Sequence, residues 1–269
     1  MKYKGYVVFA GFISILTFLT LFQIRAYPFG FSERERNTVN IQAYCVSDFG
    51  DEKDQSNNII WKARFSRFAK PSDPTKEMSP PDPNACSATY MTGKPLGLPE
   101  EINVKQKWCL GIKAQFLKKG YNWIEIYPVK SSNNIVGGDG KPNNNQEGSL
   151  YPIPLIGIIK SLDMWVWGGN YHYWLEMYVQ DFRGFLHRLP AGDINFVGWK
   201  NLRTEIPGYV PQYERRVPFL KSLTLQLIKL WSYPDERVDQ FYCYFDYLQA
   251  QTDVYIERFN GDDLANNKW

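Results

Sequence analysis

The chain has 269 residues, with 31 Lys and Arg against 28 Asp and Glu, so its formal net charge is +3. Three of the basic residues, Lys2, Lys4 and Arg25, lie within the first 26 residues, and the rest of the chain is neutral with 28 of each sign. A protein that binds a phosphate backbone needs a basic surface, so the composition disfavours nucleic acid as a partner. Low net charge favours association with other protein.

The first 26 residues have the pattern of a secretory signal peptide. Lys2 and Lys4 precede an uncharged apolar run from Gly5 to Ile24, and Arg25-Ala26 follows. Cleavage is expected near Ala26. The alternative is a retained membrane anchor, because about 20 apolar residues are enough to span a bilayer. Cleavage would leave residues 27–269, a length that fits one large all-β domain or two small ones, with no further segment suited to the membrane.

The part of the chain after the signal is expected to start with a polar N-terminal arm over residues 28–40. Strands are predicted at Asn40–Val46 and at Ile59–Phe68, the second because it is rich in aromatic and β-branched residues. From Lys70 to Glu101 the chain is rich in proline, which disfavours regular sheet or helix over most of the stretch. A long Pro-rich loop (70–101) is therefore predicted, and such loops are usually functional or mobile.

The middle of the chain is expected to contain a hairpin and a linker. Apolar residues alternate from Leu110 to Phe116 and again at Ile124 and Ile126, which predicts two strands joined at the corner Lys118–Gly120. The stretch Val129–Gly148 is rich in Asn, Gly and Ser and predicts a solvated linker. Its Asp139 and glycines are only faintly similar to a calcium loop, because regular carboxylate spacing is missing.

A β-meander is predicted from Ser161 to Ile206. Alternating apolar residues indicate strands over residues 162–166 and 174–179, and Gly168-Gly169-Asn170 between them tolerates positive φ, so a hairpin is expected. A turn at Asp181–Gly184 leads to a third strand at Phe185–Leu189. After a corner at Pro190–Asp193, a fourth runs over Ile194–Ile206.

The last predicted elements complete an all-β chain. The leucines between residues 220 and 230 fit both a helix and a strand, and a strand is chosen because its neighbours are strands. A corner at Ser232–Asp235, a final strand at Gln240–Leu248 and a polar tail from Asp253 follow. Short strands separated by polar corners predict an antiparallel β-sandwich of jelly-roll type in a single domain.

Residue types that carry catalysis are sparse. His172 and His187 are the two histidines, and neither lies close in sequence to a Ser or Cys nucleophile motif. Phosphate-loop, dinucleotide-binding and zinc signatures are also missing. A glycosidase would need a pair of carboxylates from separate strands, and nothing in the sequence points to such a pair. We therefore expect no catalytic residue, no cofactor and no metal site.

The four cysteines, Cys45, Cys86, Cys109 and Cys243, fit no metal-ligand spacing. After export they would meet an oxidising compartment, so one or two disulfides are expected. Three complete pairings are possible, and Cys86 with Cys109 is preferred because Cys86 lies in a loop that needs restraint. Cys243 lies in an apolar run and is equally well explained as a buried free thiol.

Aromatic side chains are dense, with 9 Trp, 18 Tyr and 17 Phe. If the alternating apolar residues of the meander face the core, Trp165, Trp167, Trp174 and Tyr178 face away from it. Such aromatics are enriched at protein interfaces and also stack on sugar rings. These four residues are therefore the candidate protein interface, with the Pro-rich loop as a second candidate. The alternative is that the arm or the Pro-rich loop packs over them as a second small core.

The order of several short motifs resembles one protein family, the flagellar filament outer layer protein A group of spirochaetes. The similarity covers about residues 110–264. The motifs are Leu110–Phe116, Tyr121–Ile124, Lys160–Asn170, Tyr173–Glu176, Asp181–Gly184, Phe196–Leu202, Pro234–Asp239, Glu257–Phe259 and Gly261–Asp263.

The resemblance implies a noncatalytic structural protein of the periplasmic flagellum. Such a protein is exported to the periplasm and coats a core of flagellin subunits beside other sheath proteins and further copies of itself. It contributes to the shape and stiffness of the filament and hence to motility. The resemblance also implies a sandwich similar to carbohydrate-binding or galactose-binding-like modules. The alternative function is therefore a secreted carbohydrate-binding module, with Trp165, Trp167 and Trp174 as its sugar platform.

Overall fold

The computed structural model describes residues 41–50, 59–76, 79–130, 150–212, 214–215 and 220–253. The chain divides into Met1–Val39 and Asn40–Trp269, and every described residue belongs to the second part. The expected signal peptide and arm, Asp139 with most of the predicted linker, and the tail beyond Asp253 lie outside the described residues.

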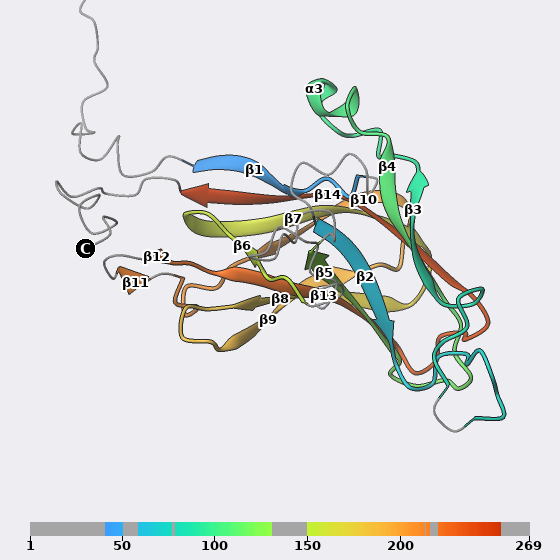
Figure 1. Ribbon diagram of the computed structural model, residues 1–269. Coiled ribbons are helices and arrows are strands. Elements are labelled where there is room, and N and C mark those ends of the chain that lie inside the picture. The colour runs from blue at the N-terminus through green and yellow to red at the C-terminus, as the bar shows by residue number, and fades with distance from the viewer. Residues whose placement is uncertain are drawn as a thin grey trace, which may run out of the picture. The chain divides into compact units, whose positions relative to one another are not determined.

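Two antiparallel sheets pack face to face (Figure 1). Sheet A has the strand order β10-β7-β14-β4-β3, and β1 is an additional partner of β14. Sheet B has the strand order β2-β5-β13-β8-β9, and β6 is an additional partner of β13. The strands of sheet A are β1 (Ile41–Ser47), β3 (Ser87–Thr92), β4 (Trp108–Ala114), β7 (Ile158–Gly169), β10 (Val197–Glu205) and β14 (Phe241–Asp253). Those of sheet B are β2 (Ile59–Phe65), β5 (Trp123–Lys130), β6 (Ile153–Pro154), β8 (Tyr173–Gln180), β9 (Leu186–Asp193) and β13 (Thr224–Ser232).

Among the described residues, little other regular structure accompanies the sandwich. A short ladder joins β11 (Glu214–Arg215) to β12 (Leu220–Lys221), and α3 (Glu100–Asn103) is a single helical turn. In the part of the chain that the structure describes, no helix is long and apolar enough to cross a membrane.

The strand connectivity is that of a jelly roll. Four strands of sheet A lie in the order β4-β14-β7-β10, and four of sheet B in the order β5-β13-β8-β9. Along the chain these eight strands pass to the other sheet at every step except β8–β9, which is a hairpin within sheet B. This is the double Greek-key arrangement of jelly rolls. The predicted all-β, antiparallel β-sandwich is confirmed.

The core lies between the sheets and follows the period-two pattern of the sequence. Leu162, Met164 and Val166 of β7 are fully buried, and so are Leu175, Met177 and Val179 of β8. Alternate side chains of a strand point to opposite faces. The two apolar sets therefore meet across the core, and the residues between them form the outer faces of the two sheets.

The predicted hairpin over 110–126 and the predicted four-stranded meander are wrong. β4 belongs to sheet A and β5 to sheet B, and β7 and β8 are divided in the same way. Alternation shows which side of a strand is buried, but a strand that pairs with its neighbour and one that packs across the core from it give the same pattern. Of the meander, the hairpin at Asp181–Gly184 is present, between β8 and β9.

Gly168 and Gly169 do not form the predicted tight turn. Both end β7, and of the three residues Asn170 has positive φ, at 59°. Gly168 instead permits close packing, because a Cβ there would lie 2.6 Å from the carbonyl oxygen of Phe196 and 2.7 Å from that of Ile194. The chain then crosses to the other sheet.

Two proline-based expectations also need correction. The Pro-rich loop (70–101) contains β3 and the first residues of α3, because residues 84–94 carry no proline and can pair with β4. Pro190, expected at a corner, lies within β9. β9 is an edge strand, where a proline need not donate to a ladder, so it is tolerated there.

The C-terminal strands agree better with the sequence. The ambiguous leucine segment forms β13, so the choice of strand over helix is confirmed. β14 starts within one residue of the predicted position and continues to Asp253, five residues beyond the expected end. The register with β7 shifts between Asp246 and Gln249, just before this extension, where Tyr247 has φ of 44°.

The predicted Cys86–Cys109 disulfide is not present, and all four cysteines are free thiols. Cys109 lies opposite Met91 in the β3–β4 ladder, whereas Cys86 precedes Ser87, which lies opposite Lys113. The two cysteines are thus five residues apart along the ladder, or about 17 Å at 3.4 Å per residue. A disulfide requires Cα atoms within about 7 Å. Cys243 is fully buried in the core, as its apolar surroundings indicated.

Candidate functional site

The four predicted interface residues all point outward, but they lie on two different faces. Trp165 and Trp167 belong to β7 of sheet A, whereas Trp174 and Tyr178 belong to β8 of sheet B. Each is half-buried. Because the two sheets pack against each other, these residues point in opposite directions. The single sugar platform of Trp165, Trp167 and Trp174 predicted from the sequence therefore does not exist.

Trp165 is covered by the chain's own Pro-rich loop. A Cβ on Gly97 would lie 2.5 Å from Cη2 of the Trp165 ring, so the backbone at Gly97 rests directly on the indole. Trp167 makes an edge contact with Tyr244, with ring centroids 5.2 Å apart, and lies opposite Trp199 in the β7–β10 ladder. For Trp165 the structure agrees with the alternative to this extent: the Pro-rich loop packs over its ring.

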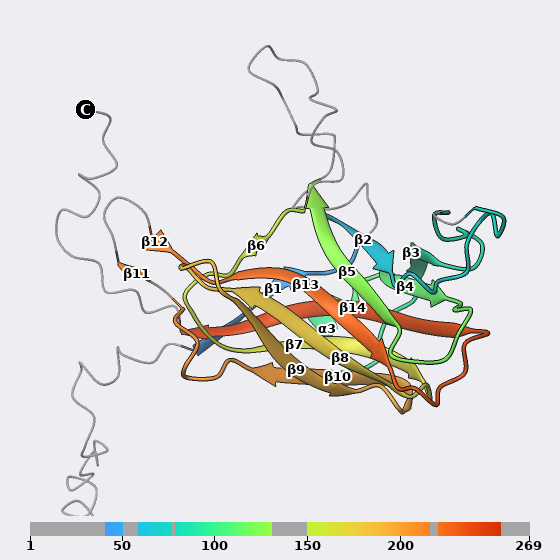
Figure 2. The ribbon, with the colours of Figure 1, turned by 90° about the horizontal axis from the view of Figure 1, so that it is seen from below.

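The outer face of sheet B carries a larger set of half-buried aromatic residues, which we call the aromatic face. Figure 2 looks onto sheet B, whose strands β5, β13 and β8 carry this set. Its members are Trp123, Tyr127, Trp174, Tyr178 and Trp231. Trp231 lies opposite Trp123 on one side and Trp174 on the other. The rings of Trp174 and Trp231 are stacked, with centroids 6.0 Å apart and an interplanar angle of 13°.

Further rings extend this row. Tyr121, which is 64% exposed, makes an edge contact with Trp174, at a centroid distance of 6.0 Å. The ring of Tyr233 also contacts Trp174, with centroids 4.7 Å apart, and it stacks on the ring of His172, with centroids 3.9 Å apart. Aromatic pairs of this kind contribute about 0.5–1.5 kcal/mol each beyond their buried area. The rings therefore form a continuous aromatic surface, and the contacts between neighbouring rings fix their positions.

Glu176 lies at the centre of the aromatic face and organises it. Its side chain is buried although it points to the outer side of β8. Oε1 accepts hydrogen bonds from Trp174 Nε1 at 3.0 Å and Arg188 Nη1 at 3.4 Å, and Oε2 accepts from Trp231 Nε1 at 3.0 Å and Tyr178 Oη at 2.9 Å. Burial and the contact with Glu176 raise the pKa of Tyr178 to about 12, so the phenol keeps the proton that it donates.

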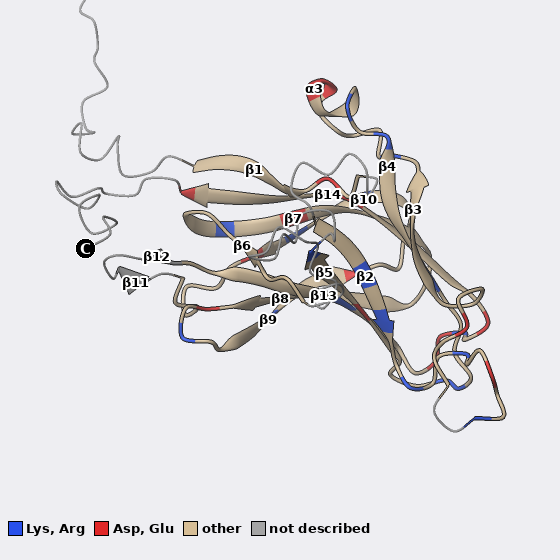
Figure 3. Ribbon diagram, in the orientation of Figure 1, with Lys and Arg blue, Asp and Glu red and all other residues tan. Residues whose placement is uncertain are grey.

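A row of alternating charges crosses the aromatic face beside Glu176. Lys229 Nζ lies 2.9 Å from Glu125 Oε1 and over the rings of Trp231 and Trp123, at 4.3 and 4.8 Å from their centroids. Arg64 pairs with Glu125 at 3.5 Å and lies over Tyr127 at 4.6 Å. Figure 3 shows the basic residues along β2 at the edge of this row. Cation–π contacts fix the long side chains on the rings.

This arrangement is suited to binding and poorly suited to acid–base chemistry. Glu125 and Glu176 lie on one face, two strands apart, as a glycosidase pair would. However, both carboxylates are already engaged by basic, indole or phenol donors, so their oxygens are not directed at a substrate. Half-buried Trp and Tyr with a charged rim are instead typical of the hot spots of protein interfaces.

Each of the two histidines contacts an aspartate in a connection between strands. His187 Nε2 lies 2.9 Å from Asp181 Oδ2, and Asp181 Oδ1 accepts hydrogen bonds from the amides of Arg183 and Phe185 in the β8–β9 turn. Burial alone would raise the pKa of Asp181, but these hydrogen bonds lower it below its ordinary value. His172 Nδ1 lies 3.4 Å from the Asp235 carboxylate.

Comparison with known proteins fits the sequence resemblance. Residues 39–260 match the family described as flagellar filament outer layer protein FlaA. The chain belongs to the FlaA family.

Two FlaA relatives come from spirochaetes. A flagellar filament outer layer-like protein of Brachyspira hyodysenteriae is 27% identical over 190 residues, which cover 71% of this chain and 78% of the relative. A flagellar filament outer layer protein of Spirochaeta aurantia is 26% identical over 161 residues, which cover 51% of this chain and 48% of the relative. The chain thus spans about half the length of the second relative.

Two solved structures of carbohydrate-binding modules are similar to this FlaA chain in architecture. One, from the β-sandwich superfamily, has a TM-score of 0.41 at 9% identity and covers 75% of this chain and 60% of its own. The other, the family 11 module of a Clostridium thermocellum cellulase, has a TM-score of 0.38 at 10% identity and covers 78% of this chain and 95% of its own. At such identities the similarity concerns the fold alone.

The sequence reasoning missed Trp123, Trp231, Glu176 and Lys229 of the FlaA aromatic face. The signal was available, since Ile124 and Ile126 face the core and set Trp123 outward. In the same way, Leu230 sets Trp231 outward. What the sequence lacked was the pairing that brings β5, β13 and β8 side by side.

A buried carboxyl group in sheet A, that of Asp246 on β14, should make the stability of this FlaA chain depend on pH. Asp246 is fully buried, and its Oδ1 accepts a hydrogen bond from Gln106 Nε2 at 2.5 Å, whereas Oδ2 has no partner among the described residues. Burial raises the pKa of Asp246 to about 8, with a further rise from Asp48. The folded chain therefore binds a proton more tightly than the unfolded chain, whose Asp pKa is about 3.9.

We expect this group's contribution to stability to be complete below about pH 4 and to be lost as the pH rises to about 8. The slope in the unfolding free energy approaches about 1.4 kcal/mol per pH unit. Urea unfolding at pH 5, 6.5 and 8 measures it. Asp246→Asn should flatten the slope, since an amide does not titrate. An unchanged slope in the variant would contradict the assignment to Asp246.

Proposed function

We propose that this chain is a noncatalytic structural component of the outer layer, or sheath, of a periplasmic flagellar filament. In this role it coats the flagellin core and contributes to the shape and stiffness of the filament, and hence to motility. The observation that carries the proposal is the family match over residues 39–260, which spans the whole described sandwich.

We further propose that the aromatic face makes the contact with the filament. Trp174 and Tyr178 remain interface candidates, and Trp123 and Trp231 join them. Large rings of this type each bury on the order of 150–250 Å² in an interface. A chain that is neutral after loss of residues 1–26 gains little from bulk charge, so apolar contact is the stronger source of affinity. Trp165 contributes less, because Gly97 already covers it.

The partners in this proposal are core flagellins, other sheath proteins and further copies of the chain, and the location is the periplasm. The basic and apolar N-terminal pattern at residues 1–26 supports export. The chain would then act free of the membrane after cleavage near Ala26.

The carbohydrate-binding alternative is less well supported. Its predicted platform is divided between two faces of the sandwich. On the aromatic face the indole N–H groups of Trp174 and Trp231 already donate to Glu176, so they are not free to bind sugar hydroxyls. Retention of the purified protein on polysaccharide beads would favour this alternative.

The test is the composition of periplasmic flagella isolated from cells that express the chain. Mass spectrometry of purified filaments should detect the chain at a constant ratio to flagellin, with an N-terminus close to Tyr27. Polysaccharide binding by the same protein should be at background. A chain that stays in the soluble fraction while flagellin sediments would contradict the proposed function.

A further inference from the structure

The charged side chains of the aromatic face differ in depth according to their sign. The carboxylates of Glu125 and Glu176 are covered, on side chains that are 18% and 5% exposed. The arginines that pair with them have side chains that are 55% exposed in Arg64 and 69% exposed in Arg188. Lys62 is exposed as well, and it has no ion pair among the described residues. A partner that approaches this face therefore meets positive charge before negative charge.

Glu125 does not neutralise all of the cations around it. Its Oε1 lies 2.9 Å from Lys229 Nζ, and its Oε2 lies 3.5 Å from Arg64 Nη2. One carboxylate shared by two cations leaves one positive charge in excess. Lys62 adds another on the same side of β2, because residues two apart in a strand share a face. The side chain of Lys229 is only 14% exposed, so Arg64 and Lys62 present the excess charge to solvent.

The excess positive charge lies along one edge of the face. β2 has the sequence Ile-Ile-Trp-Lys-Ala-Arg-Phe, with two basic residues and no acidic one (Figure 3). The opposite edge strand, β9, carries Arg188 but also Asp193, which is exposed and accepts a hydrogen bond from Tyr233 Oη at 3.2 Å. The aromatic face is thus basic along β2 and of mixed charge along β9.

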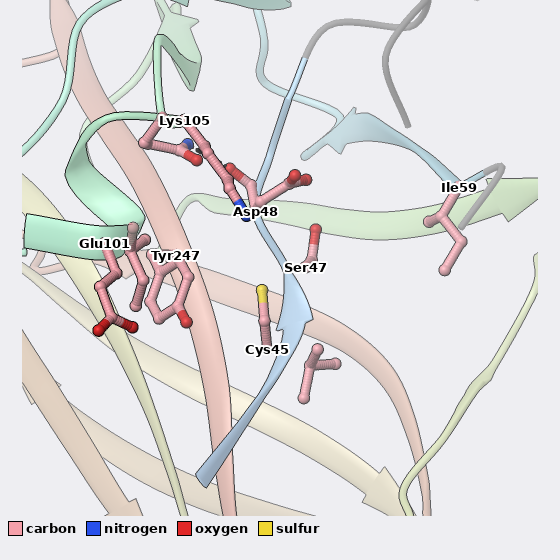
Figure 4. A pocket seen from close by; sticks show the side chains of 10 residues that line it. Cys45, Ser47, Asp48, Ile59, Glu101, Lys105 and Tyr247 are labelled. Carbon is pink, nitrogen blue, oxygen red and sulfur yellow. Dashed lines mark hydrogen bonds between the residues drawn. The ribbon is translucent and has the colours of Figure 1, made fainter. Parts of the chain in front are cut away.

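A pocket on the side of sheet A has a different balance of charge. It lies between the end of β1 and α3, which connects β3 to β4, and its volume is about 500 Å³ (Figure 4). The charged residues that line it are Asp48, Glu101 and Lys105. Two acidic residues beside one basic residue leave no positive charge in excess. An acidic partner is therefore attracted to the β2 edge of the aromatic face and not to this pocket.

We propose that the filament surface is acidic where it meets β2, so that carboxylates of a filament protein pair with Lys62 and Arg64, an inference that rests on the proposed contact between the aromatic face and the filament. Complementary charges across an interface speed association and fix the orientation of the partners. Arg64 approaches Glu125 through Nη2 alone, which leaves guanidinium donors for a second carboxylate. The apolar rings beside this edge supply the affinity, and the β2 edge supplies steering and orientation.

A protein is favoured over an acidic polysaccharide as the source of these carboxylates. The indole N–H groups of Trp174 and Trp231 donate to Glu176, so they are not free for sugar hydroxyls. The rings themselves suit apolar side chains, as in the centres of protein interfaces. The partner that fits both the rings and the basic edge is a protein surface with apolar residues next to Asp or Glu.

The test is the rate at which the purified mature chain associates with immobilised filaments that lack the endogenous protein, measured at about 0.1 M and about 1 M NaCl. This change shortens the screening length from about 10 Å to about 3 Å. Lys62→Glu should slow association about fivefold or more at the lower salt and less than about twofold at the higher salt. Lys62→Gln should fall between wild type and Lys62→Glu. The matched control is Lys105→Glu, which reverses an exposed charge at the pocket and should stay within about twofold at both.

The fold should be unaffected in Lys62→Glu, because Lys62 is exposed and has no ion pair among the described residues, and an unchanged urea midpoint checks this. Binding that does not depend on salt, or equal effects of Lys62→Glu and Lys105→Glu, would overturn the acidic contact while the proposed function stands. Absence of wild-type binding at both salt concentrations would contradict the proposed function itself. Retention on polygalacturonate beads that depends on Lys62, without binding to filaments, would assign the β2 edge to a polysaccharide and also overturn the proposal.

Discussion

Replacing Trp174 by alanine is expected to weaken binding to flagellar filaments by about 30-fold or more, which corresponds to a hot-spot loss of about 2 kcal/mol. The indole lies in the middle of the aromatic row and contacts Trp231, Tyr121 and Tyr233. Its removal also takes one donor from Glu176, so the neighbouring rings lose part of their support. Co-sedimentation of the purified variant with filaments that lack the endogenous protein measures the effect.

The matched control for this prediction is Trp199→Ala. Trp199 is also half-buried and lies on the other outer face, opposite Trp167. Both variants should remain folded, with a loss of stability of about 1–2 kcal/mol, and Trp199→Ala should bind filaments like the wild type. Equal binding by the two variants would show that the filament contact lies away from the aromatic face. Trp165→Ala should act on stability instead, because it removes the support beneath Gly97.

Gly168→Ala is expected to lower the free energy of unfolding by about 3 kcal/mol or more. The added Cβ would meet two backbone carbonyl oxygens, those of Phe196 and Ile194, at 2.6 and 2.7 Å. Backbone atoms cannot rotate away as side chains do, so the segment that leads into β10 would have to shift. Urea unfolding followed by far-ultraviolet circular dichroism measures the loss.

Gly208→Ala is the control for Gly168→Ala. A Cβ at Gly208 would meet nothing within 4 Å, and its φ is not in the positive range. Substitution there should be neutral or stabilise the chain by about 0.4–1 kcal/mol, because alanine restricts the unfolded chain. If the free energies of unfolding of the two variants differ by less than about 1 kcal/mol, the prediction is wrong, and the close approach at Gly168 does not limit the packing of β7 against the β9–β10 connection.

The direction of each side chain could be predicted from the sequence better than the pairing of the strands. The alternation at Leu175, Met177 and Val179 is local, and it correctly placed Trp174 and Tyr178 outward. Whether β7 lies beside β8 or across the core from it depends on contacts with β13 and β14, which are more than 40 residues away along the chain. The local alternation of apolar residues carries no information about these long-range strand pairings. The predicted hairpins and the single tryptophan platform failed for this reason.

The sequence predicted only part of the candidate site, because part of the site depends on long-range strand pairing. Trp174 and Tyr178 were identified because they share a strand, whereas Trp123 and Trp231 reach the same face through ladders with long sequence separation. Glu176 was not identified because a carboxylate between outward aromatics reads as an ordinary exposed residue. Only the structure shows that two indoles, a phenol and a guanidinium converge on it.

The central claim is that the chain lies on the filament with the aromatic face toward the flagellin core. Cross-linking of lysines on native filaments, followed by mass spectrometry, tests it most directly. Lys62 is exposed on the outer side of sheet B, and Lys107 is exposed near α3 at the start of β4 in sheet A. We predict cross-links from Lys62 to flagellin and none from Lys107. Cross-links to flagellin from Lys107 but not from Lys62 would contradict the claim.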